Sequence, residues 1–408
     1  MNEARALLRH TDGVNSEGRV LLFFGVLLLG GSYLLYSTDV LSGGRFVVRL
    51  AAIYLLLMSI VLCRTNKPTA VSLCVLAVLA CCILSIILYE SESVNLIVIV
   101  LIGLCFRRYG IRTLLGVAAA VVSVLFAAYF FLLIVGLIEP VVYSVGNRTR
   151  NTLGFSNVNQ GALFFLSVFV FPLVFYGKTK WCLAAIISSA ILFSVTDTRS
   201  VLLFSAAFVA FYFVFGRFSR FHNGRGALFF SEAILLATFF GSLCMGYFDN
   251  PILDGLSSGR VSMASDLVNS FTLQDWLFGY GQPVWIDNSY LKILASCGLP
   301  GTLCLLAFLA VSMRGLSVTG NAERLAFLCA SLVLGVLESV LFRPEIMISI
   351  IFWGIVFCGP ESSKNSSGGG AEGDSAPRVT SGLHPRSKHL LRFRREGCIG
   401  CDEEPDRS

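Results

Sequence analysis

Charged residues are scarce in this sequence. Only 14% of its 408 residues are Asp, Glu, Lys or Arg, whereas 55% are hydrophobic and the mean hydropathy is +0.77. Soluble domains carry about 25% charged residues, so the composition excludes a soluble protein that buries its apolar surface in one globular core. Apolar runs such as 70–89 and 114–138 can cross a hydrocarbon layer roughly 30 Å thick, and they lack the period-two alternation of membrane strands. We therefore expect an all-α integral membrane protein.

Signals for secretion, disulfide bonding and internal repetition are also missing. The first apolar run follows a polar stretch without a small-residue cleavage pattern, which indicates no cleavable signal peptide. Eleven of the 13 cysteines lie inside or at the ends of apolar runs, where Cys acts as a small hydrophobe. Cys398 and Cys401 form a single C-x-x-C that lacks the second ligand pair of a zinc site. The absence of a repeat disfavours a transporter built from inverted repeats.

Apolar segments predict about twelve membrane spans. They are 20–36, 46–63, 69–89, 94–106, 114–138, 160–177, 181–196, 200–215, 227–247, 288–313, 323–341 and 345–358. Cytoplasmic loops are enriched in Lys and Arg, and with the N-terminus inside the inner side carries fifteen of these residues against eight outside. We predict a multi-pass protein of the bacterial cytoplasmic (inner) membrane with both termini cytoplasmic. Its parts are an N-terminal segment 1–19, a bundle 20–358 and a disordered tail 359–408.

The longest connection between apolar runs, residues 248–287, is predicted to face the outside. Apolar residues between Val261 and Phe271 recur at helical spacing, which predicts a short amphipathic helix on the outer membrane face. Asp287 or Asn288 can cap the next helix, and Gly298–Gly301 with Pro300 should break or kink it about ten residues later. Broken membrane helices are tolerated where they are buried in protein or line a cavity, so a cavity is one interpretation. A simple proline-kinked span fits equally well.

Arginines on the predicted outer side indicate a binding site. They are Arg148 and Arg150 before the sixth span, Arg199 in a short hinge, Arg260 in the outer loop and Arg343 before the last span. Their position opposes the positive-inside bias, so something should hold them there. The planar guanidinium binds phosphate oxygens bidentately. Several arginines around one outer cavity would suit a lipid diphosphate.

Each of these arginines could instead pair with an acid nearby. The candidate pairs are Arg199 with Asp197, Arg343 with Glu338 or Glu345, and Arg260 with Asp254. This alternative is weaker for the whole set than for any single arginine.

Histidine is missing where an outer-face reaction would take place. All four histidines lie on the predicted inner side, so a base would have to be a carboxylate, with Asp254, Asp266, Asp287 and Glu338 as candidates. No outer H-x-x-H or D-x-D cluster indicates a catalytic metal, and we expect neither a metal nor a cofactor. Asp249 and Asp254 form one pair that could share an ion.

The residues of the predicted outer side also carry a family resemblance. Six motifs occur in order across residues 145–345: Arg150-Asn-Thr-Leu-Gly-Phe-Ser-Asn-Val-Asn159, Thr196-Asp-Thr-Arg-Ser200, Ser258-Gly-Arg260, Trp276-Leu-Phe-Gly-Tyr-Gly281, Asp287-Asn-Ser-Tyr-Leu291 and Gly298-Leu-Pro-Gly301. The ordered set resembles the O-antigen ligase/polymerase superfamily, particularly the Wzy-type polymerases of O-antigen and capsule.

The resemblance implies a GT-C-like glycosyltransferase that joins undecaprenyl-diphosphate-linked oligosaccharide repeat units into surface polysaccharide. Arg199 and Arg260 match the family's arginine positions best. We predict Arg199, Arg260 and Asp287 as catalytic residues, and as substrate-binding residues Arg148, Arg150, Asn159, Asn288, Tyr290 and Arg343. The expected partners are the lipid-linked oligosaccharide, the bilayer, a chain-length regulator and a flippase, and no nucleic acid.

Two other functions remain open from the sequence. Ligases of the superfamily have histidine where this chain has Asp287, a departure that favours a polymerase over transfer of glycan to another acceptor. A flippase would bind the same lipid without chemistry, but it gives no reason for a long structured outer loop.

Overall fold

The structure is a computed structural model that describes residues 16–41, 45–62, 78–85, 93–145, 148–176, 179–220, 224–247, 251–257, 259–280, 282 and 284–359. The chain separates into two units, Met1–Glu361 and Ser362–Ser408. The second unit lies outside the described residues, and so do nearly all of the predicted tail, with Cys398 and Cys401, and most of the predicted segment 1–19.

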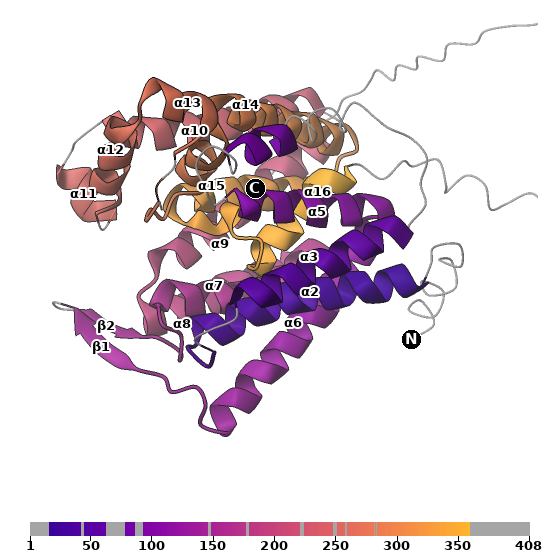
Figure 1. The fold of residues 1–408 in the computed structure, drawn as a ribbon, viewed down its shortest axis with the longest axis vertical. Helices are drawn as coiled ribbons and strands as arrows, with labels where there is room; N and C mark the ends of the chain where they lie inside the picture. Colours follow the sequence, from indigo (N-terminus) through magenta and orange to yellow (C-terminus); the bar gives the residue numbers. More distant parts are fainter. Residues whose placement is uncertain are drawn as a thin grey trace, which may run out of the picture. The chain divides into compact units, whose positions relative to one another are not determined.

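Helices form most of the first unit (Figure 1). Eleven of the predicted spans coincide with α2 (Ser16–Ser37), α3 (Arg45–Leu62), α5 (Val94–Tyr109), α6 (Ile111–Ile134), α7 (Val158–Tyr176), α8 (Thr179–Thr196), α9 (Arg199–Arg220), α10 (Gly224–Tyr247), α14 (Ser289–Val318), α15 (Ala322–Leu337) and α16 (Met347–Cys358). For the predicted span 69–89, the described residues 78–85 are helical. Within the described ranges, α2, α6, α9, α10 and α14 are long and apolar enough to cross a membrane. The chain is an α-helical membrane protein.

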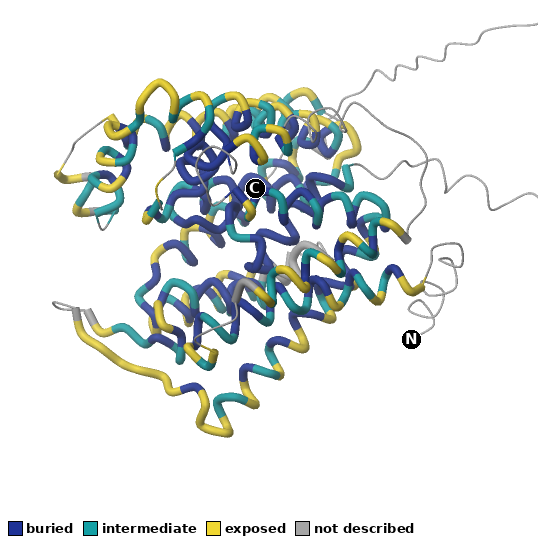
Figure 2. The backbone as a smooth tube through the Cα atoms, in the orientation of Figure 1, coloured by how far each residue is buried: buried dark blue, intermediate teal, exposed yellow. Residues whose placement is uncertain are grey.

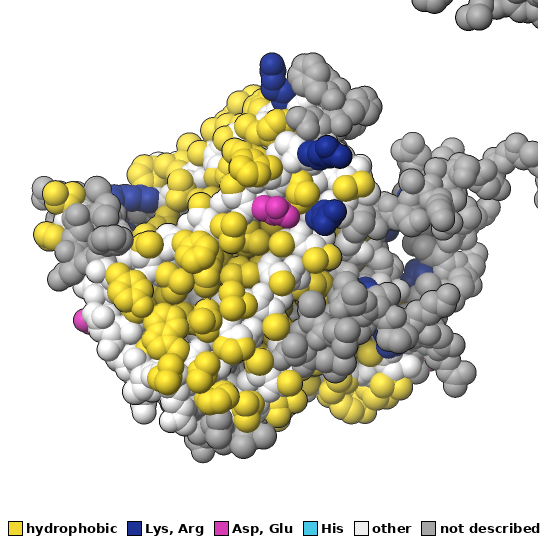
Figure 3. Space-filling view, turned by 90° about the horizontal axis from the view of Figure 1, so that it is seen from above, with side chains coloured by type: hydrophobic (Ala, Val, Ile, Leu, Met, Phe, Trp, Pro, Cys, Tyr) yellow, Lys and Arg dark blue, Asp and Glu magenta, His cyan; other side chains and the backbone are white. Residues whose placement is uncertain are grey.

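The surface of the bundle carries many apolar side chains. On α10, Phe229, Leu236 and Phe240 are each more than half exposed. Figure 3 shows one face of the molecule on which hydrophobic side chains gather and few charged ones appear. Exposing such a surface to water costs free energy, whereas contact with lipid tails does not, so this surface suits a membrane.

Close helix packing depends on glycines at contact points. α16 packs along α5 and α6, and α9 packs along α15 (Figure 1). A Cβ atom at Gly103 would overlap the ring of Phe357, and one at Gly354 would lie 2.7 Å from the side chain of Leu114. Apolar side chains gain little by leaving lipid, so membrane helices associate through close van der Waals packing. Small residues at the contacts allow that close approach.

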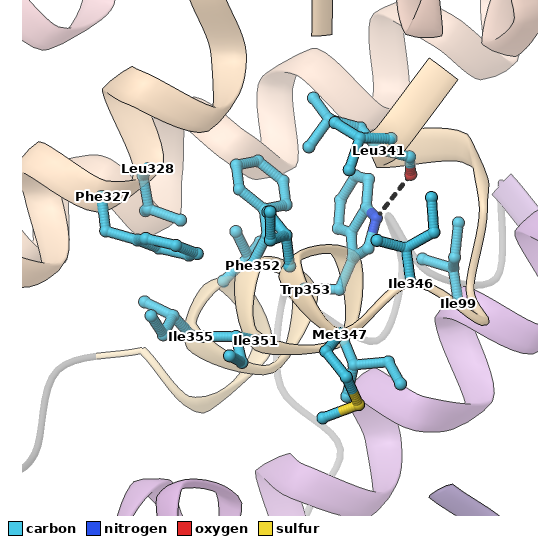
Figure 4. Close-up of a cluster of buried hydrophobic side chains, with 14 of the residues drawn as sticks. Ile99, Phe327, Leu328, Leu341, Ile346, Met347, Ile351, Phe352, Trp353 and Ile355 are labelled. Atoms are coloured by element: carbon cyan, nitrogen blue, oxygen red, sulfur yellow. Dashed lines mark hydrogen bonds between the residues drawn. The ribbon is translucent and has the colours of Figure 1, made fainter. Parts of the chain in front are cut away.

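The last helix, α16, is enclosed by protein. All its residues from Met347 to Phe357 are buried, and Figure 2 shows α15 and α16 as largely buried stretches. The indole Nε1 of Trp353 donates a hydrogen bond of 2.8 Å to the carbonyl of Leu341, as Figure 4 shows. The predicted span 345–358 therefore meets protein side chains rather than lipid along its length.

A two-stranded antiparallel hairpin interrupts the helical pattern between α6 and α7. Strand β1 (Val142–Val145) pairs with β2 (Arg148–Asn151), and Tyr143 lies opposite Arg150. The sequence-based prediction of an all-α protein missed it. A local signal was available, since the β-branched and aromatic residues of β1 are followed by Gly146-Asn147, a pair typical of hairpin turns.

The predicted outer loop folds into three short helices, α11 (Pro251–Ser257), α12 (Arg260–Ser270) and α13 (Leu273–Phe278). The predicted amphipathic helix is confirmed as α12. Its apolar residues Val261, Ala264 and Val268 are buried in protein, and the predicted position of this helix on the outer membrane face stays a prediction. A Cβ atom at Gly246 of α10 would overlap Val268, so α12 packs directly on α10.

The predicted break in α14 is confirmed at Gly298. Its φ of 66° and ψ of 179° depart from helical geometry inside α14, and such a φ favours glycine. A Cβ atom there would overlap the backbone of Leu277, and the N–H of Tyr280 donates to the carbonyl of Ala295 at 2.6 Å. The break thus receives the end of α13 and is buried in protein.

Candidate functional site

The end of α15 brings several chain segments together. The helix ends at Leu337, so the predicted span 323–341 is too long, and Glu338 lies in the connection beyond it, before the 3₁₀ helix η1 (Ser339–Phe342). The Ser289 hydroxyl, at the start of α14, donates to the Glu338 carbonyl at 2.7 Å and accepts the N–H of Leu341 at 3.0 Å. These bonds fix the backbone from which the Glu338 side chain extends.

Arg260, the first residue of α12, forms an ion pair with Glu338. One guanidinium nitrogen, Nη2, lies 3.2 Å from Oε1 of Glu338, and Nη1 donates to the Ser257 carbonyl at 3.3 Å. The preceding Gly259 has a φ of 82°, which turns the chain into the helix where a side chain would be strained. The Arg260 side chain is 19% exposed and that of Glu338 is 4% exposed, so the pair is largely shielded from water.

Groups from four segments influence the Glu338 carboxyl, which lies outside the membrane-spanning helices. Burial, followed by the negative charge of Asp287, raises its pKa to about 7, while Arg260, the Ser200 hydroxyl and Arg343 act to lower it. Desolvation disfavours the charged form, and a like charge adds to that effect. Glu338 can therefore gain or lose a proton near neutral pH.

The structure corrects the acidic partner expected for Arg260. The sequence suggested Asp254 as a partner, but the Asp254 carboxylate accepts the N–H of Ser262 at 2.9 Å, in the first turn of α12. A carboxylate near a helix N-terminus is stabilised by the unpaired N–H groups there. Asp254 thus holds the start of α12, and Glu338 meets the guanidinium.

Arg150 joins the hairpin to the connection between α8 and α9. Its Nε donates to the Thr196 carbonyl and its Nη2 to the side-chain oxygen of Asn159, both at 3.3 Å. Two residues predicted to bind substrate are therefore in contact. Asp197, next to Thr196, has a φ of 51°, a strained value that marks the tight turn into α9.

Arg199 is the first residue of α9 and its side chain is exposed. Its neighbour Ser200 is buried and acts on the Glu338 carboxyl. The start of α9 and the end of α15 thus meet, and we call this region, with Ser200, Arg260, Asp287, Glu338 and Arg343, the Glu338 end. Arg199 lies in the first turn of α9 together with Ser200. The prediction that Arg199 and Arg260 face one cavity stays a prediction.

A second ion pair lies near the start of α16. The guanidinium of Arg49, on α3, is 2.9 Å from Oε1 of Glu345, which is 2% exposed. Arg343 lies between the two buried acids in sequence, and its charge acts on Glu338. Of the two acids that the sequence offered to Arg343, Glu345 therefore has Arg49 as an ion-pair partner.

Two predicted substrate-binding residues are used inside the bundle. The Asn288 side chain caps α14 by accepting the N–H groups of Tyr290 and Leu291, and its amide donates to Ser242 and to the Val336 carbonyl. The Tyr290 hydroxyl has two acceptors for its one proton, the Thr238 hydroxyl at 2.8 Å and the Leu332 carbonyl at 3.0 Å. Both residues are buried, so their contacts support the fold. Arg148 begins β2, and its predicted role stays a prediction.

Sequence reasoning named Glu338 as one of several candidate bases and as a possible partner of Arg343, and it named Ser200 only as the last residue of the Thr196–Ser200 motif. A signal for Glu338 was available, since an acid that follows an apolar helix needs a partner or a function. Its partner Arg260 lies 78 residues away, a separation that no local pattern reveals.

A cavity of about 320 Å³ lies at the opposite ends of α9 and α15. It is lined by Phe215, Gly224, Ala227, the residues from Leu316 to Ala322, and Leu325. Ser317, in this lining, is 4% exposed, and we call this region the Ser317 end. None of the predicted site residues lies in the lining.

In comparisons with known proteins, no family model, no curated protein and no solved structure matches the chain.

Proposed function

We propose that this protein is a metal-independent glycosyltransferase of the bacterial cytoplasmic membrane with a GT-C-like bundle of about twelve spans. It polymerises undecaprenyl-diphosphate-linked oligosaccharide repeat units on the outer face of that membrane. The observation that carries the proposal is the shielded Arg260–Glu338 pair, with Asp287 and Arg343 beside it. Charged groups with a shifted pKa gather at functional sites, which supports an anionic substrate at this end of the helices.

The reaction makes one glycosidic bond and breaks another. A hydroxyl of the incoming unit attacks the anomeric carbon of the growing chain, whose bond to the diphosphate oxygen breaks. Negative charge then grows on the leaving undecaprenyl diphosphate, and preorganised arginines stabilise it. Arg199 and Arg260 are assigned this role, with Arg150 and Arg343 as further phosphate contacts and Asp287 as the acceptor of the hydroxyl proton.

The direct test uses purified protein in detergent and one substrate, a lipid-diphosphate repeat unit of known chemistry. The energy of the sugar–diphosphate bond is sufficient, so glycan should lengthen without nucleotide sugar, ATP or added metal, and chelators should not stop it. A flippase would leave the glycan unchanged while moving the lipid across vesicles, and a ligase would require a different acceptor. Unchanged substrate after incubation with folded protein would contradict the proposal.

Asp287 can be tested separately from the helix cap, because the cap is Asn288. Asp287→Asn keeps the shape of the side chain and removes its charge. We expect normal protein levels and much slower chain extension, measured on the same lipid-linked unit. Normal-length polysaccharide from this variant would remove Asp287 from the reaction and leave the arginines.

A further inference from the structure

Arg260 is already paired with the Glu338 carboxyl, so a diphosphate that binds Arg260 would meet a second negative group there. A diphosphate that binds this guanidinium must approach a group already paired with the Glu338 carboxyl at 3.2 Å. Glu338 cannot turn away into water, since its side chain is 4% exposed and its backbone is held by Ser289 and by the Leu334 carbonyl. An incoming anion would therefore face a carboxylate at close range.

The charges around Glu338 already balance before any ligand arrives. Arg260 approaches from α12, Arg343 from the segment after η1, and Asp287 from the segment before α14, while α9 contributes the neutral Ser200. Arg199 precedes Ser200 on the exposed side of the same helix start, and Glu345 is paired with Arg49. The two carboxylates and two guanidinium groups that act on one another here are already matched, so an anion that binds Arg260 competes with Glu338 for the same positive charge.

A proton is the simplest compensation, and Glu338 is the group able to take it. Its pKa of about 7 reflects burial first and Asp287 second, and it is lowered by the Arg260 charge. An anion on Arg260 offsets that charge and adds its own, so the pKa of Glu338 rises further on binding. The carboxyl then carries its proton throughout the neutral range.

We propose that a diphosphate anion binds Arg260 together with one proton taken up from solvent by Glu338. This inference rests on the proposed function, because it assumes that Arg260 is a diphosphate ligand. It also divides the work of the two acids. Glu338, once protonated, is neutral beside the bound diphosphate, and Asp287 remains the carboxylate that accepts the hydroxyl proton.

The affinity for diphosphate should then depend on pH in a defined way. Above the pKa of free Glu338, each unit of rising pH should weaken binding by up to about tenfold, because one proton must be taken up with the anion. Well below that pKa the proton is already present, and this contribution to the pH dependence should vanish.

The test is calorimetry on the full chain in detergent, slightly above neutral pH, in buffers of different ionisation enthalpy. Inorganic pyrophosphate and undecaprenyl diphosphate are the two probes, so that the shared diphosphate chemistry is separated from the lipid tail. We expect an uptake of about one proton per anion bound in the wild type and in Glu232→Gln, a matched control on α10. Glu338→Gln should bind either probe without this uptake.

Asp287→Asn provides a second variant that keeps Glu338 in place. Removing the negative charge that raises the Glu338 pKa should move the pH range of proton uptake downward. Binding without proton uptake by the wild type, or uptake that persists in Glu338→Gln, would overturn the inference and leave the diphosphate site intact. Failure of the folded wild type to bind either probe at any pH would overturn both this inference and the assignment of Arg260 to diphosphate.

Discussion

The Glu338 end and the Ser317 end lie at opposite ends of the same two helices, α9 and α15. Each contains a buried hydroxyl without a hydrogen-bond partner, Ser200 and Ser317, but the two ends hold charged groups differently. At the Glu338 end, the Ser289 hydroxyl both donates and accepts a hydrogen bond, and Arg260 meets a carboxylate. At the Ser317 end, the buried Ser317 hydroxyl has no hydrogen-bond partner and lines the cavity of about 320 Å³.

Arginines show the same contrast. Arg225 and Arg314 lie near the Ser317 end, and their side chains are exposed. Arg260 has only 19% of its side chain exposed, and both of its terminal nitrogens, Nη1 and Nη2, donate hydrogen bonds. Hydrogen bonds to a charged donor are stronger than those between neutral groups, and two of them fix the position of this guanidinium. The comparison indicates that the Glu338 end is built to hold charge in place.

The largest expected effect separates the arginines of the two ends. Arg260→Lys keeps the charge but loses the fork that can hold Glu338 and a phosphate together, so chain extension should fall by about a hundredfold or more. Arg314→Lys, the matched control, should change it little. Elongation of a lipid-linked repeat unit by the purified variants provides the measurement, and equal rates for the two variants would remove the distinction between the ends.

The pH dependence of stability gives the next effect. The pKa of Glu338 is raised from 4.5 to about 7, so the folded protein binds this proton more tightly than the unfolded chain does. The stabilisation is complete below about pH 4.5 and is lost as pH rises to about 7, by an amount on the order of 3 kcal/mol. Thermal unfolding midpoints in detergent should therefore fall across this window.

Two glutamine variants check the assignment to Glu338. Glu338→Gln should flatten the decline in unfolding midpoint between acid and neutral pH, because the neutral amide has no proton to lose. Glu232→Gln, near the opposite end of the bundle, should keep the decline of the wild type. An unchanged decline in Glu338→Gln would assign the pH dependence to another group.

The positions of the helices could be predicted from the sequence, but their surroundings could not. Long apolar runs determine where helices form, and the predicted spans fall on them. The same residues are compatible with lipid and with protein, however, so the burial of α16 and the packing of α12 on α10 depend on distant glycines such as Gly103 and Gly246. The hydrophobic effect removes a side chain from water, but it does not determine whether lipid or another helix then contacts that side chain.

The candidate site was predictable as a set of charges and not as a set of pairs. Arg260 and Asp287 stood out because charged groups are unusual beside apolar helices. The sequence suggested the nearby Asp254 as the ion-pair partner of Arg260, whereas its partner in the structure is Glu338. Asn288 and Tyr290 belong to a recognisable motif, yet their side chains hold α14 against α10 and α15. Motif membership cannot distinguish a structural hydrogen bond from a substrate contact.

The smallest expected effect uses one substitution at both ends. Ser289→Ala would leave the Leu341 N–H and the Glu338 carbonyl without their partner, which should destabilise the protein by about 1–3 kcal/mol. Ser317→Ala removes a buried hydroxyl that makes no hydrogen bond, so stability should be unchanged or rise by up to about 1 kcal/mol. Both values come from unfolding in detergent at one pH, with the wild type in parallel. The two substitutions delete the same atom from buried serines, so their difference reports the hydrogen bonds rather than lost side-chain volume. A destabilisation by Ser317→Ala as large as that by Ser289→Ala would show that the Ser317 hydroxyl does bind something, such as water in the cavity, and the contrast between the two ends would then rest on their charges alone.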